Sequence, residues 1–190
     1  ILDFLKKGIT VEQIEHAAMV LNKHHIVGEF SFMIGLPYET SDDMLKTIRF
    51  VKKLRKIGPY VGTQSPQLYR PIPGGELYNE CVKLGFLAPK NIREWTSEKL
   101  TASGYLDLDK LPWIQKDNKT IVIIRYVTTI LSANKFRWWL TDKTFGFFIK
   151  KLTLDSINVL FCLRERTNFW KFPLEYKCFE ILQIVKKKIS

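Results

Sequence analysis

The sequence has few cysteines, no long apolar run and no targeting segment. Its three cysteines, Cys81, Cys162 and Cys178, are too few and too widely spaced for a disulfide framework or a Cys-x-x-Cys metal site. Such usage is typical of a reducing compartment, so we expect a cytoplasmic protein. The most apolar stretch, residues 121–131, is shorter than the roughly 18 residues that cross a bilayer, and Arg125 interrupts it. No positively charged start followed by an apolar segment marks a signal peptide.

Positive charge is distributed unevenly along the chain. The net charge is +11, from 30 Lys and Arg against 19 Asp and Glu. Residues 1–110 carry 15 basic and 13 acidic side chains, whereas residues 111–190 carry 15 and 6. The basic excess therefore belongs to the C-terminal part, which indicates two regions with different roles. We predict an α/β region over 1–90 and a mostly helical, basic extension over 91–190.

Helix and strand signals alternate in the first half of the chain. Apolar spacing predicts an amphipathic helix over 11–23, and Thr10 with Gln13 forms a capping box before it. The apolar run 30–34 is typical of a strand that is buried on both faces of a parallel sheet. The same reasoning gives helices over 1–7, 42–56 and 77–84 and strands over 30–36 and 61–69.

This alternation with short loops predicts parallel strands joined by helical crossovers. The strands at 30–36 and 61–69 are then neighbours, and the helix over 42–56 connects them. Such a pattern fits either a doubly wound sheet or part of a β/α barrel. Periodicity does not choose between the two.

Three motifs carry a resemblance to a known family. Residues 1–14 read Ile-Leu-Asp-Phe-Leu-Lys-Lys-Gly-Ile-Thr-Val-Glu-Gln-Ile, residues 30–40 read Phe-Ser-Phe-Met-Ile-Gly-Leu-Pro-Tyr-Glu-Thr, and residues 67–74 read Gln-Leu-Tyr-Arg-Pro-Ile-Pro-Gly. They resemble, in order, the stretch after the fourth barrel strand, the fifth strand with its Gly-Leu-Pro-Gly-Glu-Thr turn, and the sixth strand of radical S-adenosylmethionine enzymes. Tyr38 stands where that turn has its second glycine. The likeness is closest to the subgroup with an N-terminal cobalamin-binding domain, including anaerobic magnesium-protoporphyrin ester cyclases.

The resemblance implies a fold and a chemistry. The chain would be the C-terminal part of a partial (β/α)6 TIM-like barrel. A [4Fe–4S] cluster, held by a Cys-x-x-x-Cys-x-x-Cys loop, would cleave S-adenosylmethionine reductively for methyl transfer, cyclisation or related chemistry on an unactivated carbon. That loop is absent from this chain, so we expect a fragment that is inactive alone. Cobalamin as a further cofactor, an electron donor such as flavodoxin or ferredoxin, and a small or lipid-like substrate are also implied.

Ligands in sheets and barrels of this class lie at the carboxyl ends of the strands. Gly35 lacks a Cβ atom, so an adenine ring could approach its backbone. Leu36 and Leu68 could enclose the ring while backbone groups read its edge. We therefore predict that the cofactor-binding residues are Gly35, Leu36, Pro37, Leu68 and Tyr69.

Other candidate residues each have two interpretations. Arg70 either binds substrate or pairs with a carboxylate on the surface. Glu39 either contacts ligand or complements the dipole of the helix that follows. The pair His24 and His25 lacks a cysteine or paired carboxylate to complete a ligand set, so we predict no metal site. Cys81 recurs with leucines at helical spacing and is expected in the core.

The C-terminal region interleaves aromatic and basic residues, notably at 137–139, 147–151 and 186–188. This pattern is found on nucleic-acid surfaces and on helices that lie at a membrane surface. We favour a helical extension whose aromatic side chains pack inward, with helices over 121–131, 145–149 and 157–163. The alternative function is a non-catalytic basic module that binds nucleic acid or a membrane surface. For the enzyme, we expect no nucleic-acid partner, and peripheral membrane contact stays open.

Overall fold

A computed structural model describes residues 1–95, 111–114, 116–128 and 145–174. The chain divides into two compact units, Ile1–Gln115 and Lys116–Ser190, and each is described by itself. The described strands form two parallel pairs. Their membership of a partial (β/α)6 barrel stays a prediction, as does the division of the chain near residue 90.

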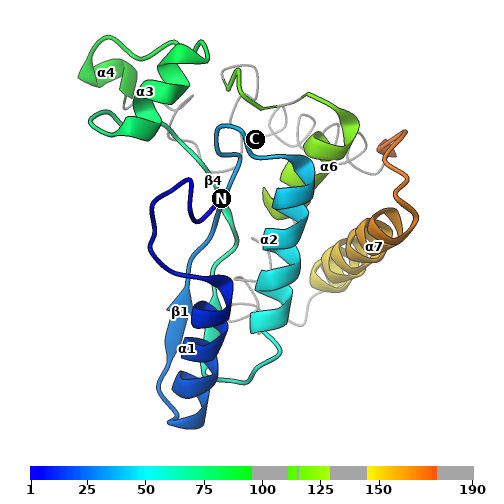
Figure 1. Cartoon of the computed structure of the whole chain (residues 1–190). Coiled ribbons are helices and arrows are strands. Elements are labelled where there is room, and N and C mark those ends of the chain that lie inside the picture. Colours follow the sequence, from blue (N-terminus) through cyan, green and yellow to red (C-terminus); the bar gives the residue numbers. More distant parts are fainter. Residues whose placement is uncertain (96–110, 115, 129–144, 175–190) are drawn as a thin grey trace. The chain divides into compact units, whose positions relative to one another are not determined.

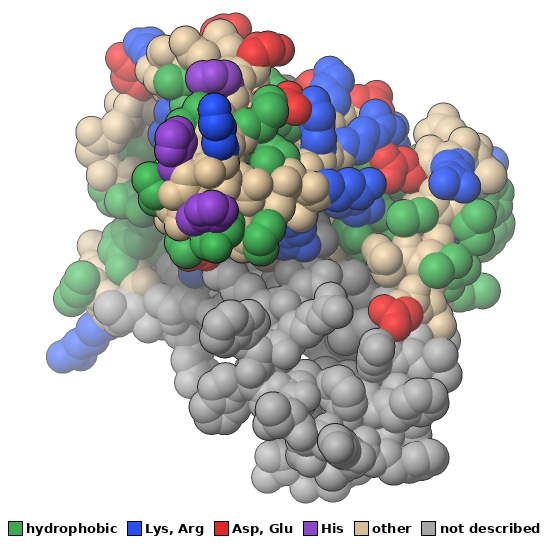
Figure 2. Space-filling model, turned by 90° about the horizontal axis from the view of Figure 1, so that it is seen from below, with side chains coloured by type: hydrophobic (Ala, Val, Ile, Leu, Met, Phe, Trp, Pro, Cys, Tyr) green, Lys and Arg blue, Asp and Glu red, His purple; other side chains and the backbone are tan. Residues whose placement is uncertain are grey.

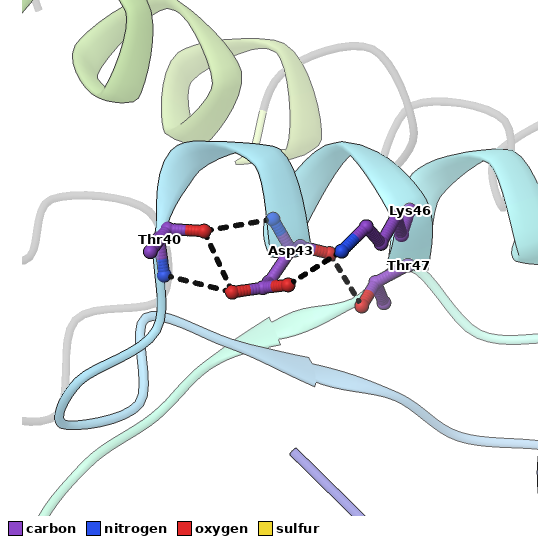
Figure 3. A network of polar contacts seen from close by, with 4 residues as sticks. All are labelled: Thr40, Asp43, Lys46 and Thr47. Atoms are coloured by element: carbon purple, nitrogen blue, oxygen red, sulfur yellow. Dashed lines mark hydrogen bonds and ion pairs between the residues drawn. The ribbon is translucent and has the colours of Figure 1, made fainter.

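Two capped helices frame the first unit. Helix α1 spans Val11–Lys23 and α2 spans Ser41–Leu54. The capping box predicted at Thr10 and Gln13 is present, so both the helix and its start are confirmed. At the start of α2, the Thr40 hydroxyl accepts from the Asp43 N–H at 3.2 Å, while the Asp43 carboxylate accepts from Thr40 (Figure 3).

Four short strands pair in parallel, as the sequence predicts. Strand β1 (Gly28–Phe30) pairs with β3 (Val61–Thr63), and β2 (Met33–Ile34) pairs with β4 (Gln67–Leu68). Helix α2 follows β2 and precedes β3, so it forms the connection between the paired segments (Figure 1). The predicted neighbouring parallel strands are therefore confirmed.

The two predicted long strands are each interrupted, which the sequence prediction missed. Hydrogen bonds from Gln64 N–H to the Phe30 carbonyl (2.9 Å) and from Gln67 N–H to the Phe32 carbonyl (2.8 Å) bridge the break. Pro66, which has no N–H, lies between these donors and cannot continue a regular ladder. The expectation of burial on both faces is wrong for β2, because Ile34 is fully buried whereas Met33 is 41% exposed.

The predicted helix over residues 1–7 is wrong. The segment forms a turn in which Leu5 N–H donates to the Ile1 carbonyl at 2.9 Å, and Lys6 takes a positive φ of 52°. One turn fixes several backbone angles for few hydrogen bonds, so it does not propagate. Helix α3 (Glu76–Lys83) is present as predicted, with Cys81 fully buried, and a short helix α4 spans Ile92–Trp95.

One apolar cluster of the first unit forms where α1, α2 and β3 meet. Ala18, Leu54 and Val61 are its buried centre. Partly buried apolar side chains surround them: Ile14, Phe30, Phe32, Phe50 and Ile57. Ile34 and Leu36, at the carboxyl end of β2, are also buried and are not members of this cluster.

The described residues of the second unit form helices α6 and α7. Helix α6 spans Asn118–Tyr126, begins at the Asp117 cap, and confirms the described part of the helix expected over 121–131. Helix α7 spans Phe145–Thr167. The Tyr126 and Phe161 rings stack at 3.7 Å between centroids. Among the described residues, no helix is both long enough and apolar enough to cross a membrane. The predicted aromatic and basic segments at 137–139 and 186–188 lie outside the described residues.

Candidate functional site

The carboxyl ends of β2 and β4 bring the predicted site residues together. Ile34 pairs with Leu68, and the Tyr69 N–H donates to the Ile34 carbonyl at 2.8 Å. The turn of Gly35, Leu36 and Pro37 therefore lies beside the segment of Leu68, Tyr69 and Arg70. Ends of neighbouring parallel strands are the usual place for a ligand in this class of fold. The cofactor contacts of these residues stay a prediction.

The turn after β2 has an unusual residue at its third position. The Glu39 N–H donates to the Leu36 carbonyl at 3.1 Å, and Tyr38 has a φ of +64°. With Pro37 in second place, this is the pattern of a type II turn, whose third position normally holds glycine. The strained Tyr38 thus occupies the place of the glycine in the resembling motif. Its hydroxyl donates to Glu80 at 3.1 Å.

Gly35 is required by the local structure. Its φ of +74° is one that side chains rarely adopt, and an added Cβ would meet the Leu68 side chain. The Ile114 side chain also lies within 3.3 Å of that position. The place that a Cβ atom would take on Gly35 is therefore filled by the end of the Leu68 side chain, and the approach of an adenine ring to this backbone stays a prediction.

Two backbone groups at the turn already have protein partners. The Trp113 indole N–H donates to the Gly35 carbonyl at 2.8 Å, across 78 positions of sequence. The Leu36 N–H donates to a Glu39 carboxylate oxygen at 3.0 Å. A carbonyl oxygen has a second lone pair, whereas an N–H donates once. The Gly35 carbonyl can therefore still accept from a ligand, and the Leu36 N–H cannot without displacing Glu39.

Glu39 is the functional candidate that sequence reasoning left undecided. Its side chain is buried, with 7% of the residue exposed, and its second oxygen, Oε1, has no hydrogen-bond partner among the described residues. Burial raises the pKa of Glu39 to about 7, against the opposing effect of the Leu36 and Gly35 N–H groups. Such a carboxyl can hold or release a proton near neutrality. In the sequence, Glu39 can be recognised as a carboxyl group that stands between the end of a strand and the cap of a helix.

Aromatic side chains surround the end of β4. The Tyr69 and Trp113 rings lie 6.3 Å apart, and the Phe86 ring lies 6.0 Å from Trp113. Burial, with Cys81 nearby, raises the pKa of the Tyr69 phenol to about 12, so it stays protonated and can donate a hydrogen bond. Arg70 is partly exposed, and its role toward a substrate stays a prediction.

The described residues do not offer a ligand set for an iron–sulfur cluster. No three His, Cys, Asp or Glu side chains within the described ranges lie together as a metal site. Cys81 is buried in the first unit and Cys162 is partly buried in the second, while Cys178 lies outside the described residues.

The chain is similar to an uncharacterized methyltransferase of Pyrococcus horikoshii, with 32% identity over 97 residues. The match covers 51% of this chain and 20% of that protein, so the aligned part spans about a fifth of the relative's length. No family model matches the chain, and no solved structure matches it.

Proposed function

We propose that this chain is the C-terminal part of a radical S-adenosylmethionine enzyme, in which the carboxyl ends of β2 and β4 form one wall of the cofactor pocket. The observation that carries the proposal is the parallel pairing that sets Gly35 and Leu36 beside Leu68 and Tyr69. The methyltransferase name of the relative supports a role in methyl transfer, ahead of the cyclisation that the resemblance also implies.

The chain's own residues would bind and shield the cofactor. S-adenosylmethionine, when bound, supplies a methyl group or the precursor of a carbon radical. The apolar side chains of Leu36 and Leu68 would exclude water from such a site. Trp113 fixes the Gly35 carbonyl, whose second lone pair would accept from an amino group of the ligand. Tyr69 would donate to the ligand only in place of its hydrogen bond to Cys81.

The parts of the reaction that need metal lie outside this wall. The [4Fe–4S] cluster, and cobalamin if it is used, would be held by residues other than those described here. Arg70 would contact an anionic group of the substrate at the mouth of the site. An electron donor such as flavodoxin or ferredoxin would reduce the cluster of the whole protein.

The test uses the whole gene product. After anaerobic reconstitution and chemical reduction, we expect 5′-deoxyadenosine or S-adenosylhomocysteine to form from S-adenosylmethionine. Assembly of a cluster with neither product would contradict the proposal.

The contribution of this chain is tested by Leu68→Ala. Loss of the apolar contact should raise the Kd for S-adenosylmethionine about tenfold, as measured by calorimetry. The control is Leu54→Ala, a buried core change in the same unit, which should lower stability while leaving the Kd of the folded fraction unchanged. Equal effects of both variants on Kd would contradict a specific role for Leu68.

A further inference from the structure

The second unit has one side of α7 that does not face its core. Phe161 marks the inner side, because its ring stacks on Tyr126, and the Tyr126 hydroxyl donates to Asn158 at 2.7 Å. Val159 and Leu163 each lie two residues from Phe161, which places them about 200° around the helix. Both side chains are exposed. The outer side of α7 therefore carries exposed apolar side chains, with exposed Asp155 and Arg166 beside them.

The segment after α7 is held in a shape that exposes further apolar side chains. The Arg164 guanidinium donates to the carbonyls of Phe169, Lys171 and Phe172 at 3.0–3.1 Å. Trp170 turns inward and packs edge-on against Phe161. Phe172 is 72% exposed although its backbone is fixed. Because these contacts fix the backbone, the phenylalanine side chains of this segment are held exposed to solvent.

We call the exposed apolar residues of α7 and the following segment the apolar surface of the second unit: Val159, Leu160, Leu163, Phe169, Phe172 and Leu174. On the right of Figure 2, the side on which α7 lies in Figure 1, hydrophobic side chains lie together with basic and acidic ones. Six large apolar side chains exposed within 16 positions of sequence are more than isolated surface residues, and such groupings mark contact sites.

The charge of the second unit indicates which kind of partner the apolar surface fits. Residues 116–190 carry 15 Lys and Arg against 6 Asp and Glu, a net charge of +9, whereas residues 1–115 carry only +2. Exposed Arg166 and Lys171 lie among the apolar residues. Aliphatic side chains flanked by cations suit the boundary between acyl chains and anionic headgroups. They suit nucleic acid less well, because four of the six residues are aliphatic and do not stack on bases as the rings of Phe169 and Phe172 could.

We infer that the second unit docks on the surface of an anionic lipid membrane, inserting this apolar surface among the headgroups while its Lys and Arg contact the lipid phosphates. The inference does not depend on the proposed enzymatic function. A protein that acts on a lipid-like substrate would gain access to it in this way.

The test is sedimentation of the 190-residue chain with vesicles. We expect binding to phosphatidylcholine vesicles that contain about 30% phosphatidylglycerol, and at least about tenfold weaker binding to phosphatidylcholine alone. Binding should fall several-fold when salt rises from about 0.05 M to about 0.5 M, because salt screens the headgroup charge. Equal binding to both vesicle types, or no binding to either, would overturn the inference.

Two variants locate the contact. Leu163→Glu and Phe172→Glu each replace an apolar side chain by a charge, and each should weaken binding to the anionic vesicles about tenfold or more. The control is Leu87→Glu, which makes the same change at a residue of the first unit that is 91% exposed, and which should bind normally. Circular dichroism checks that all three variants fold, and Val159→Glu replaces any that does not.

Two results would count against lipid as the occupant. Loss of binding in Leu87→Glu as large as that in Leu163→Glu would show that charge alone decides. Displacement of the chain from vesicles by a short single-stranded oligonucleotide, with Leu163→Glu binding that oligonucleotide as well as the parent chain does, would assign the basic unit to nucleic acid.

Discussion

Residues 1–115 and 116–190 hold their elements together by different means. In the first unit, hydrogen bonds of the main chain set the geometry: two capping boxes start its helices, parallel pairs join its strands, and a strained turn ends β2. In the second unit, a stack of Tyr126 on Phe161, extended by Trp170, joins α6, α7 and the segment that follows.

This difference determines which single substitutions should destabilise each unit. Main-chain hydrogen bonds are spread over many residues, so most single side-chain changes in the first unit should act locally. An aromatic stack concentrates its contacts in a few rings, so removal of one ring should loosen both helices. Single substitutions in each unit test this contrast.

Phe161→Ala should have the largest effect. Removing this buried ring deprives Tyr126 of its stack and Trp170 of its edge contact, at a cost of about 3–5 kcal/mol in the free energy of unfolding. Hydrogen exchange measured by mass spectrometry should become fast in α6 and α7 and stay slow in α1 and α2. Ile48→Ala, in the core face of α2, should give the reverse pattern. Faster exchange throughout the chain in either variant would break the comparison.

Gly35→Ala should cost the first unit about 2–4 kcal/mol, although the change is a single methyl group. The added Cβ meets Leu68, and alanine is strained at a φ of +74°. Denaturant unfolding measures the loss. Leu68→Ala combined with Gly35→Ala should recover the part due to the clash and leave the part due to φ. Additive losses in the double variant would show that Leu68 does not fill the space beside Gly35.

Glu39 should make the first unit less stable as the pH rises. Because its pKa is raised from 4.5 to about 7, the folded state keeps a proton that the unfolded state releases between these values. The stability is fully present below about pH 4.5 and is lost as the pH rises through about 7, a change of about 3 kcal/mol. Urea unfolding at pH 5 and pH 8 should show this difference in the parent chain and a much smaller one in Glu39→Gln.

Asp43 provides a control, because its contribution to stability changes with pH in the opposite direction. Hydrogen bonds from Thr40 hold the pKa of Asp43 below its ordinary value, so its contribution is present at neutral pH and lost on acidification. Asp43→Asn should therefore flatten the acid side of the stability profile and leave the fall between pH 5 and pH 8 intact. If Asp43→Asn removes the fall in stability between pH 5 and pH 8, Glu39 is not the group whose titration causes it.

Tyr38→Gly should have the smallest effect, a gain of no more than about 1 kcal/mol. Glycine relieves the left-handed backbone, while the loss of the hydrogen bond to Glu80 and of the edge contact with Phe4 offsets part of the gain. Tyr38→Ala loses the same contacts and keeps most of the strain, so its melting temperature should fall. A lower melting temperature for the glycine variant than for the alanine variant would contradict the role of strain.

Local signals allowed much of the first unit to be predicted. Helix α1 and both capping boxes depend on residues three or four positions apart, which the sequence displays directly. The parallel pairing followed from the alternation of elements. The prediction of one continuous strand over 61–69 missed the break near Pro66, because the effect of a proline on a strand depends on its neighbours.

The sequence predicted that the ends of two neighbouring strands lie together, and it did not predict how their side chains pack. Gly35 and Leu68 lie together as expected, but their mutual packing and the bond from Trp113 to Gly35 join residues 33 and 78 positions apart. No local pattern reports such contacts. The positive φ of Tyr38 could have been predicted, because a type II turn with Pro37 at its second position favours glycine at its third position.

The two-stranded sheets also bear on how an isolated chain behaves in solution. The carbonyls of Phe30 and Phe32 face the second strand segment, so the main chain of the alternate residues, Glu29 and Met33, faces the opposite edge. Such an edge can pair with another copy of itself. The strands are short and Glu29 is charged, and both features oppose self-association. We therefore expect self-association to be weak. Assemblies should form in concentrated samples at high salt, and dilution at low salt should reverse them.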